Sequence, residues 1–253
     1  PASYTFTYAE NSLETAILGT VTATDADVGD TVGYSIKTNI LVTNPSDPTG
    51  PQVNAYEIDS SGQISLTDAG AAAFTDDFEE LTNSHVIVVT ASDGTNSTDI
   101  NVTLNETNVN DNAPVFVDPE NPEDPITGGY TFEYPENSAD ETILGTVKAV
   151  DADVSDVISY SITQNIYAAD DVNEDYPLYE INSVTGEISL TASGVLAYTD
   201  DYEELTNSHG IIVTASDGQG KTTDINVTLN ETNVNDNAPI FVDPENQEDP
   251  ITD

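Results

Sequence analysis

The chain contains no Cys, Met, Trp or Arg, and its only cationic side chains at neutral pH are Lys37, Lys148 and Lys221. Without Cys there is no disulfide, no thiol nucleophile and no Cys-based zinc site. Against the three Lys stand 47 Asp and Glu residues, so the formal net charge is −44 at pH 7. A surface this anionic repels nucleic acid and anionic lipid, and we expect neither as a partner.

Long apolar runs and helical periodicity are also missing. No run approaches the roughly 20 residues that a membrane span needs, so we expect no direct membrane insertion by this segment. The hydrophobic residues, 37% of the chain, alternate instead with a period of two, which argues against disorder and predicts β-strands. Because so dense a negative charge opposes a compact fold, the surface needs salt, low pH or bound cations.

The sequence is duplicated. The run TDINVTLNETNVNDNAP occupies residues 98–114 and recurs letter for letter at 223–239, a spacing of 125 residues (223 − 98). YTFTYAENS begins at Tyr4 and YTFEYPENS at Tyr130, a spacing of 126 residues (130 − 4). The small difference in spacing indicates two tandem copies of one domain that differ by short insertions and deletions.

These spacings predict the domain boundaries. Repeat 1 is expected over residues 1–116 and repeat 2 over residues 130–241. Residues 117–129 are acidic, contain three Pro and end in Gly-Gly, so we expect a solvated, semi-rigid linker there. Residues 242–253 have the composition of the next linker, and we expect the chain to be a segment of a longer array.

Alternating apolar residues predict seven short strands in each repeat. The expected strands are 4–8, 17–24, 32–36, 56–58, 63–67, 86–91 and 99–105 in repeat 1, and 130–134, 143–150, 157–162, 178–181, 187–191, 211–215 and 224–230 in repeat 2. Helical turns are expected only near 71–74 and 195–198. The pattern predicts an all-β fold of two tandem seven-stranded Greek-key β-sandwiches, antiparallel and immunoglobulin-like, elongated head to tail.

Five short acidic motifs follow the strands in the same order in both repeats. In repeat 1 they contain Glu10, then Asp25 and Asp27, then Asp77 and Glu79, then Asp93, and last Asn110, Asp111 and Asn112. In repeat 2 they contain Glu136, then Asp151 and Asp153, then Asp201 and Glu203, then Asp217, and last Asn235 and Asp236. Acidic residues that served only solubility would not recur in one order at strand ends.

The motifs ENS, DAD, DDYEEL, ASDG and NVNDNAPIF resemble the five calcium-binding signatures of the cadherin repeat, and they cover both copies nearly end to end. In that family, calcium ions bound at the junction between successive repeats stiffen an elongated extracellular chain. The resemblance therefore implies a cadherin-type sandwich and Ca²⁺ as the bound ion.

The resemblance also implies a ligand set. For the junction between the repeats it names Glu10, Asp77, Glu79, Asp111 and the Val109 carbonyl on one side, Asn110 and the Asn112 carbonyl in the linker, and Asp151, Asp153 and Asp217 on the other side. Asp25, Asp27 and Asp93 would serve a preceding repeat, and Glu136, Asp201, Glu203, Asn235 and Asp236 a following one. Two carboxylates about 4 Å apart repel by roughly 1 kcal/mol even in water, so such a junction requires cations. Ca²⁺ suits it because the ion accepts 6 to 8 oxygen ligands in irregular geometry.

Enzymatic activity is not expected. A glycosidase needs one carboxyl group with a raised pKa in a dry cleft, whereas Asp77 and Glu79 are expected in a hydrated, anionic group. His85 and His209 have no second His or Cys nearby in sequence, so we expect structural roles for both.

We therefore expect a calcium-binding extracellular segment of a cell-surface or secreted protein, which serves adhesion or acts as a spacer. Its partners would be calcium ions and either copies of itself or a cell-surface polysaccharide. The alternative is a carbohydrate-binding module of a secreted polysaccharide-degrading or surface protein, which would need an exposed aromatic face. The scarcity of cationic residues resembles that of secreted proteins from saline environments, including bacterial or marine surface proteins.

Overall fold

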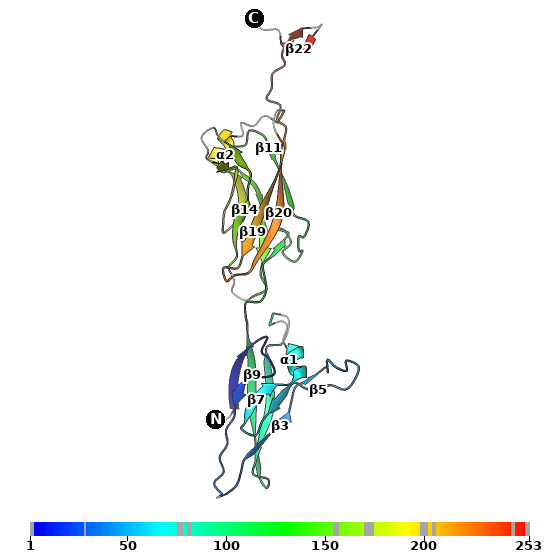
Figure 1. Cartoon of the computed structure of the whole chain (residues 1–253), viewed down its shortest axis with the longest axis vertical. Coiled ribbons are helices and arrows are strands. Elements are labelled where there is room, and N and C mark those ends of the chain that lie inside the picture. The colour runs from blue at the N-terminus through cyan, green and yellow to red at the C-terminus, as the bar shows by residue number, and fades with distance from the viewer. Residues whose placement is uncertain are drawn as a thin grey trace. The chain divides into compact units, whose positions relative to one another are not determined.

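A computed structural model describes residues 3–27, 29–74, 78–79, 82–153, 157–169, 175–197, 202–203, 206–243 and 246–250. The chain forms two compact units (Figure 1). The first consists of Pro1–Asp111 with Ala152–Ser155, and the second of Asn112–Asp151 with Asp156–Asp253. The first unit ends at Asp111, whereas repeat 1 is predicted to end at residue 116, and the segment predicted as a linker belongs to the second unit.

The first unit contains two sheets. The larger has the order β1-β9-β8-β3, with bounds Ser3–Ala9, Ser97–Thr107, Ser84–Ser92 and Gly33–Thr38. The smaller has the order β2-β7-β6, with bounds Gly19–Thr20, Gln63–Leu66 and Tyr56–Ile58. A short ladder of β4 (Leu41–Val42) and β5 (Val53–Asn54) and the helix α1 (Asp68–Phe74) complete the unit.

The second unit repeats this plan. Its larger sheet has the order β11-β20-β19-β14, with bounds Tyr130–Pro135, Thr222–Thr232, Ser208–Ser216 and Ser159–Gln164. Its smaller sheet has the order β12-β18-β17, with bounds Ile143–Thr146, Glu187–Leu190 and Tyr179–Ile181. Three two-stranded ladders pair β10 (Val115–Val117) with β13 (Lys148–Val150), β15 (Tyr167–Ala169) with β16 (Asp175–Pro177), and β21 (Val242–Asp243) with β22 (Asn246–Pro250). The helix α2 spans Ala192–Ala197.

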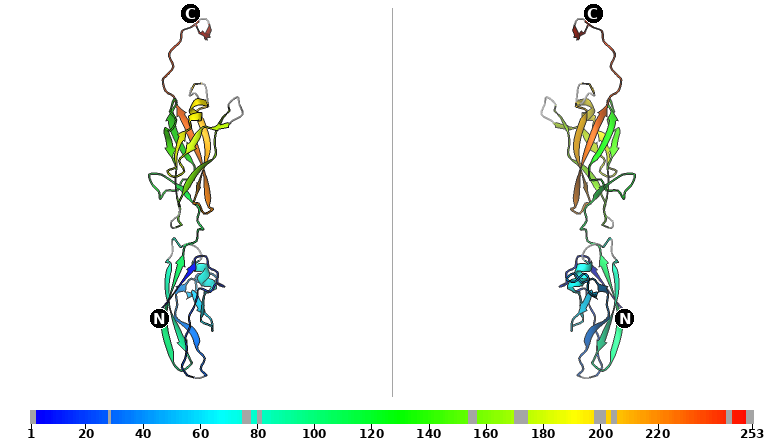
Figure 2. Two further views of the ribbon diagram at one scale, coloured as in Figure 1. Left: turned by 90° about the vertical axis from the view of Figure 1, so that its left-hand side faces the viewer. Right: turned by 90° about the vertical axis from the view of Figure 1, so that its right-hand side faces the viewer.

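Alternation along the strands builds a separate core in each unit, as the sequence predicts. In β8, His85, Ile87 and Val89 point inward, whereas Val86 between them is exposed. Successive side chains of a strand point to opposite faces, so one face of the sheet is apolar and contributes to the core. Figure 2 shows the strands of each unit from two further sides. The all-β sandwich fold is confirmed.

One strand pairing differs from the predicted antiparallel arrangement. β1 pairs with β9 in parallel, and β11 pairs with β20 in parallel. β1 and β9 therefore run in the same direction, and so do β11 and β20. Because of this, the chain enters a unit at one end and leaves it at the other, which is what a tandem array of such units requires.

The helical turns begin earlier than the sequence predicts. α1 begins at Asp68 rather than near residue 71, because the Thr67 hydroxyl oxygen accepts a hydrogen bond from the Gly70 N–H at 3.0 Å. Thr191 caps α2 in the same way, with Gly194 N at 2.8 Å. A threonine cap satisfies one of the free N–H groups of the first turn.

The segment 117–129 is not simply a solvated linker. Its acidic tip is exposed, but its two ends fold back into a hairpin, in which Val117 forms a β-bridge with Pro125 and the Ile126 N–H donates to the Phe116 carbonyl at 2.8 Å. Val117 is buried, and Ile126 packs against the core of the second unit. The acidic, Pro-rich composition of the segment predicts a solvated linker, because it contains few apolar residues besides Val117 and Ile126, which hold its two ends.

Each unit also buries a chain of polar side chains. In the second unit, the Tyr134 hydroxyl lies 3.3 Å from Glu231 and 3.0 Å from the Tyr179 hydroxyl, which lies 2.5 Å from His209 Nδ1. Burial raises the pKa of Tyr134 and lowers the pKa of His209. In the first unit the corresponding residues are Tyr8, Tyr56, His85 and Glu106. These contacts place both histidines in the cores.

Candidate metal centre

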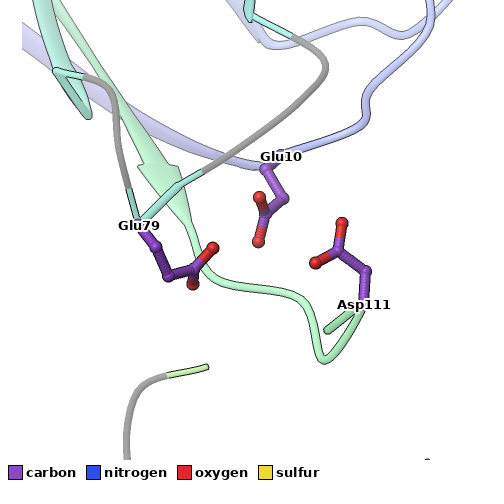
Figure 3. Close-up of side chains that lie close together, drawn as sticks. All are labelled: Glu10, Glu79 and Asp111. Atoms are coloured by element: carbon purple, nitrogen blue, oxygen red, sulfur yellow. The ribbon is translucent and has the colours of Figure 1, made fainter. Parts of the chain in front are cut away.

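Three carboxylates meet at one end of the first unit. Glu10, Glu79 and Asp111 each bring one oxygen to within 4.8 Å of the others, and we call them the Glu10 cluster. Glu10 follows β1, Glu79 lies between α1 and β8, and Asp111 follows β9. Figure 3 shows the three carboxylates directed toward a shared space. Three motifs that are far apart in the sequence thus bring their carboxylates together in the fold.

Glu10 is the anchor of the cluster. Its side chain is 2% exposed, and its two oxygens accept hydrogen bonds from the backbone N–H groups of Val109 (2.5 Å) and Phe78 (2.9 Å). Each carboxylate oxygen keeps a second lone pair for another partner. Glu10 therefore ties the segment after β9 to the loop before β8.

Asparagine side chains hold the other two carboxylates. Asn11 has a positive φ of 58°, which Asn tolerates better than most residues, and its Nδ2 donates to Asp111 Oδ2 at 2.6 Å. Asn108 Nδ2 donates to Glu79 Oε1. Asn108 Nδ2 also donates to Asp153 Oδ1 at 3.2 Å. Asn108 and Asp153 both belong to the first compact unit.

Negative charge accumulates in this cluster. Burial raises the pKa of Glu79 above its ordinary value, and the charges of Glu10 and Asp153 add to the rise. A carboxylate beside other carboxylates is costly to ionise unless a cation neutralises the group. The three clustered ligand atoms are all carboxylate oxygens, which fit a hard cation such as Ca²⁺.

The second unit builds the same arrangement from Glu136, Glu203 and Asp236, which we call the Glu136 cluster. Glu136 is also 2% exposed, and its oxygens accept the N–H groups of Val234 (2.5 Å) and Tyr202 (2.8 Å). The matching asparagine contacts are Asn137 Nδ2 to Asp236 Oδ2 at 2.7 Å and Asn233 Nδ2 to Glu203 Oε1. The arrangement is thus a property of the repeat.

A third acidic group lies elsewhere in the first unit. Asp25, Asp27 and Asp30 have carboxylate oxygens within 4.8 Å of one another, and all three are exposed. Asp25 and Asp93 line one cavity of about 240 Å³. Asp30 is not among the ligands predicted above, although it stands three residues after Asp27 in the DADVGD stretch.

Asp93 and Asp217 occupy equivalent turns. Asp93 Oδ1 accepts the N–H groups of Asn96 and Thr95, both at 2.6 Å, and these bonds lower the pKa of Asp93. Asp217 Oδ1 accepts three backbone N–H groups, from Gln219, Gly220 and Lys221, at 2.7, 2.9 and 3.1 Å. Each turn fixes the direction of its carboxylate.

The remaining predicted ligands have varied positions. Asp153 and Asp217 are buried, and Asp151 is partly buried. Val109 contributes its N–H to Glu10, and Asn110 and Asn112 follow it in the same segment. Asn235 directly precedes Asp236 in the segment after β20. Asp77 and Asp201 fall outside the described residues.

Neither described helix is long and apolar enough to cross a membrane. No protein-family model matches the chain. Human protocadherin gamma-A7 is 35% identical over 161 residues, which cover 61% of this chain and 15% of that protein. Cadherin-99C of Drosophila melanogaster is 29% identical over 233 residues, which cover 85% of this chain and 12% of that protein.

Among solved structures, mouse cadherin-23 EC22–24 superposes with a TM-score of 0.65 at 24% identity, covering 93% of this chain and 65% of that one. The sequence homologues are thus protocadherins and cadherins, and the structural neighbours are cadherin extracellular domains, which confirms the predicted resemblance. The chain spans only a small part of each curated relative. The carbohydrate-binding alternative finds no support among these relatives.

Proposed function

We propose that this homologue of the protocadherins and cadherins is a calcium-stiffened, non-enzymatic segment of an extracellular adhesion protein. The observation that carries the proposal is the recurrence of one carboxylate cluster in both units, with the same buried Glu and the same asparagine contacts. A buried carboxylate beside two others is costly unless a cation compensates it. Because the same unfavourable carboxylate cluster recurs in both units, we infer that each cluster binds the same kind of cation.

We infer that Ca²⁺ between the repeats is held by the Glu10 cluster with Asp77, Asn110 and the carbonyls of Val109 and Asn112, and by Asp151, Asp153 and Asp217. The Glu136 cluster, with Asp201 and Asn235, would serve a following repeat, and Asp25, Asp27 and Asp93 a preceding one. Calcium would supply the positive charge that neutralises these carboxylates. Mg²⁺ fits less well because it requires a strict octahedron.

The mechanism is thermodynamic linkage. An ion that binds both repeats in one orientation favours that orientation over all others, by about 2.7 kcal/mol per site at a hundredfold excess over Kd. The expected consequence is a stiff extracellular array that holds adhesive surfaces at a set distance from the cell. Copies of the same chain and cell-surface polysaccharide are the two adhesive partners that the proposal allows.

Small-angle scattering tests the stiffening. In millimolar Ca²⁺ the distribution of interatomic distances should be narrow, and chelation should broaden it because the two repeats then reorient freely. Asp111→Asn should move the calcium midpoint of this change to higher concentration. Asp236→Asn is the matched control, because it alters the other cluster, and it should leave the midpoint unchanged.

Two results would refute the proposal. One is the same scattering profile in chelator and in calcium. The other is an equal shift of the midpoint by both substitutions, which would indicate a general effect of charge rather than a site between the repeats.

A further inference from the structure

The backbone of Phe78 is held from two sides. Its N–H donates to Glu10 Oε2 at 2.9 Å, and its carbonyl oxygen accepts a hydrogen bond from Asn83 Nδ2 at 2.7 Å. Phe78 directly precedes Glu79, which is a member of the Glu10 cluster. Two hydrogen bonds therefore fix the backbone next to Glu79, and only one of them comes from a carboxylate of the cluster.

Asn83 is itself bonded to the larger sheet of the first unit. It immediately precedes β8, and its carbonyl oxygen accepts the N–H of Glu106 in β9 at 2.9 Å. This bond extends the pairing of β8 with β9 by one position beyond Ser84 and Asn105. Because the backbone of Asn83 is tied to the sheet, its side chain fixes the segment that carries Glu79 relative to that sheet.

The second unit repeats each of these bonds. Asn207 Nδ2 donates to the Tyr202 carbonyl oxygen at 2.9 Å, and the Tyr202 N–H donates to Glu136 at 2.8 Å. The Asn207 carbonyl oxygen accepts the N–H of Glu231 at 2.8 Å. Glu203, which follows Tyr202, belongs to the Glu136 cluster. The bonds recur although the residue they hold is Phe in one unit and Tyr in the other.

The two asparagine side chains also share an unfavourable feature. Oδ1 of Asn83 and Oδ1 of Asn207 are buried and have no hydrogen-bond partner among the described residues. A buried polar atom without a partner is unfavourable, and an apolar side chain at the same position would avoid this cost. What these two positions gain from Asn is therefore the hydrogen bond that Nδ2 donates, rather than packing.

On the basis of the calcium binding proposed above, we propose that Asn83 and Asn207 are positioning residues for the ion. Each holds the segment that carries a cluster carboxylate, Glu79 or Glu203, so that the carboxylate is in place before the ion binds. Neither asparagine is a ligand itself. Residues that orient a metal ligand in this way are worth about 10–100-fold in metal affinity.

Three Leu variants separate positioning from stability. Asn83→Leu removes the donor and keeps a side chain of similar size, and Asn207→Leu does the same in the second unit. Asn39→Leu is the matched control, because Asn39 Nδ2 donates to a backbone carbonyl oxygen outside the cluster, that of Tyr56, at 2.6 Å. Asn39 Oδ1 also accepts the Tyr56 N–H at 3.1 Å, so the control loses at least as many hydrogen bonds.

Hydrogen exchange, read residue by residue by NMR, follows both clusters in one molecule through the amides of Phe78 and Tyr202. We expect Asn83→Leu to raise about tenfold the calcium concentration that halves the exchange rate of the Phe78 amide, and to leave the value for Tyr202 unchanged. Asn207→Leu should have the reverse effect. In chelator, the Phe78 amide should exchange faster in Asn83→Leu than in the wild type, because its segment is held less firmly without any ion.

A thermal melt in chelator verifies that each variant folds, and Asn83→Ala, which cannot overfill the site, replaces Asn83→Leu if the latter does not. Wild-type amides that do not respond to calcium would refute calcium binding itself. A normal wild-type response with the same calcium midpoint in Asn83→Leu would overturn the positioning role alone. An equal shift of the midpoint in Asn39→Leu would also overturn it, because the effect would then follow the stability of the unit.

Discussion

Glu10→Ala is expected to lower the free energy of unfolding of the first unit by about 3–5 kcal/mol in chelating buffer. Glu10 accepts backbone N–H bonds from Val109 and Phe78 in a buried position, and hydrogen bonds to a charged group contribute about 1.5–3 kcal/mol each. Native-state hydrogen exchange, followed on peptides from each unit, measures the change where it occurs. The loss should be confined to the first unit, because each unit has its own core.

Glu14→Ala is the matched control for this prediction. It removes the same charge from an exposed position four residues away, and it should change the unfolding free energy by no more than about 0.5 kcal/mol. If Glu10→Ala and Glu14→Ala behaved alike, the buried carboxylate would not anchor the end of the unit. Glu136→Ala should reproduce the Glu10→Ala effect in the second unit, because its two bonds are equivalent.

Phe116→Ala should destabilise the second unit by about 3–5 kcal/mol, the range for removing a buried Phe side chain. Phe116 is 2% exposed, and β10 holds it over Tyr130. The substitution should uncover the Tyr130 ring, which Phe116 contacts. Urea-induced unfolding, followed by circular dichroism once with calcium and once with chelator, measures the change in unfolding free energy.

Phe241→Ala provides an internal control, because NAPIFVDPEN at residues 237–246 repeats NAPVFVDPEN at residues 112–121, and Phe241, which corresponds to Phe116, is 86% exposed. In dilute solution its cost should stay within about 0.5 kcal/mol. Equal costs for the two substitutions would mean that the segment from residue 115 to 126 contributes little to the second core, and the hairpin would then be only a linker.

Local patterns predict much of this molecule. Alternation along β8 predicts which side chains enter the core, because a strand turns successive residues to opposite faces. The resemblance of the acidic motifs to the cadherin signatures implies that Glu10, Glu79 and Asp111 act together, and the structure brings their carboxylate oxygens within 4.8 Å of one another. The order of the motifs along the chain does not by itself say which of them meet at one end of the sandwich.

Features that depend on distant partners were not predicted. The parallel pairing of β1 with β9 joins residues about a hundred positions apart, and nothing within either strand encodes the direction of its neighbour. The hairpin after Phe116 depends on Val117 and Ile126, two apolar residues within an acidic stretch. The strand predicted over 17–24 shortens to Gly19–Thr20 because, among the described residues, no segment pairs with residues 22–24.

A calorimetric titration of the wild-type chain and of the double variant Glu10→Gln/Glu136→Gln decides whether the two carboxylate clusters bind calcium. We expect saturable calcium binding by the wild type, weaker binding of magnesium, and a loss of calcium affinity of about tenfold or more in the double variant, because each cluster loses one charged ligand. Identical calcium isotherms for the two proteins would contradict it.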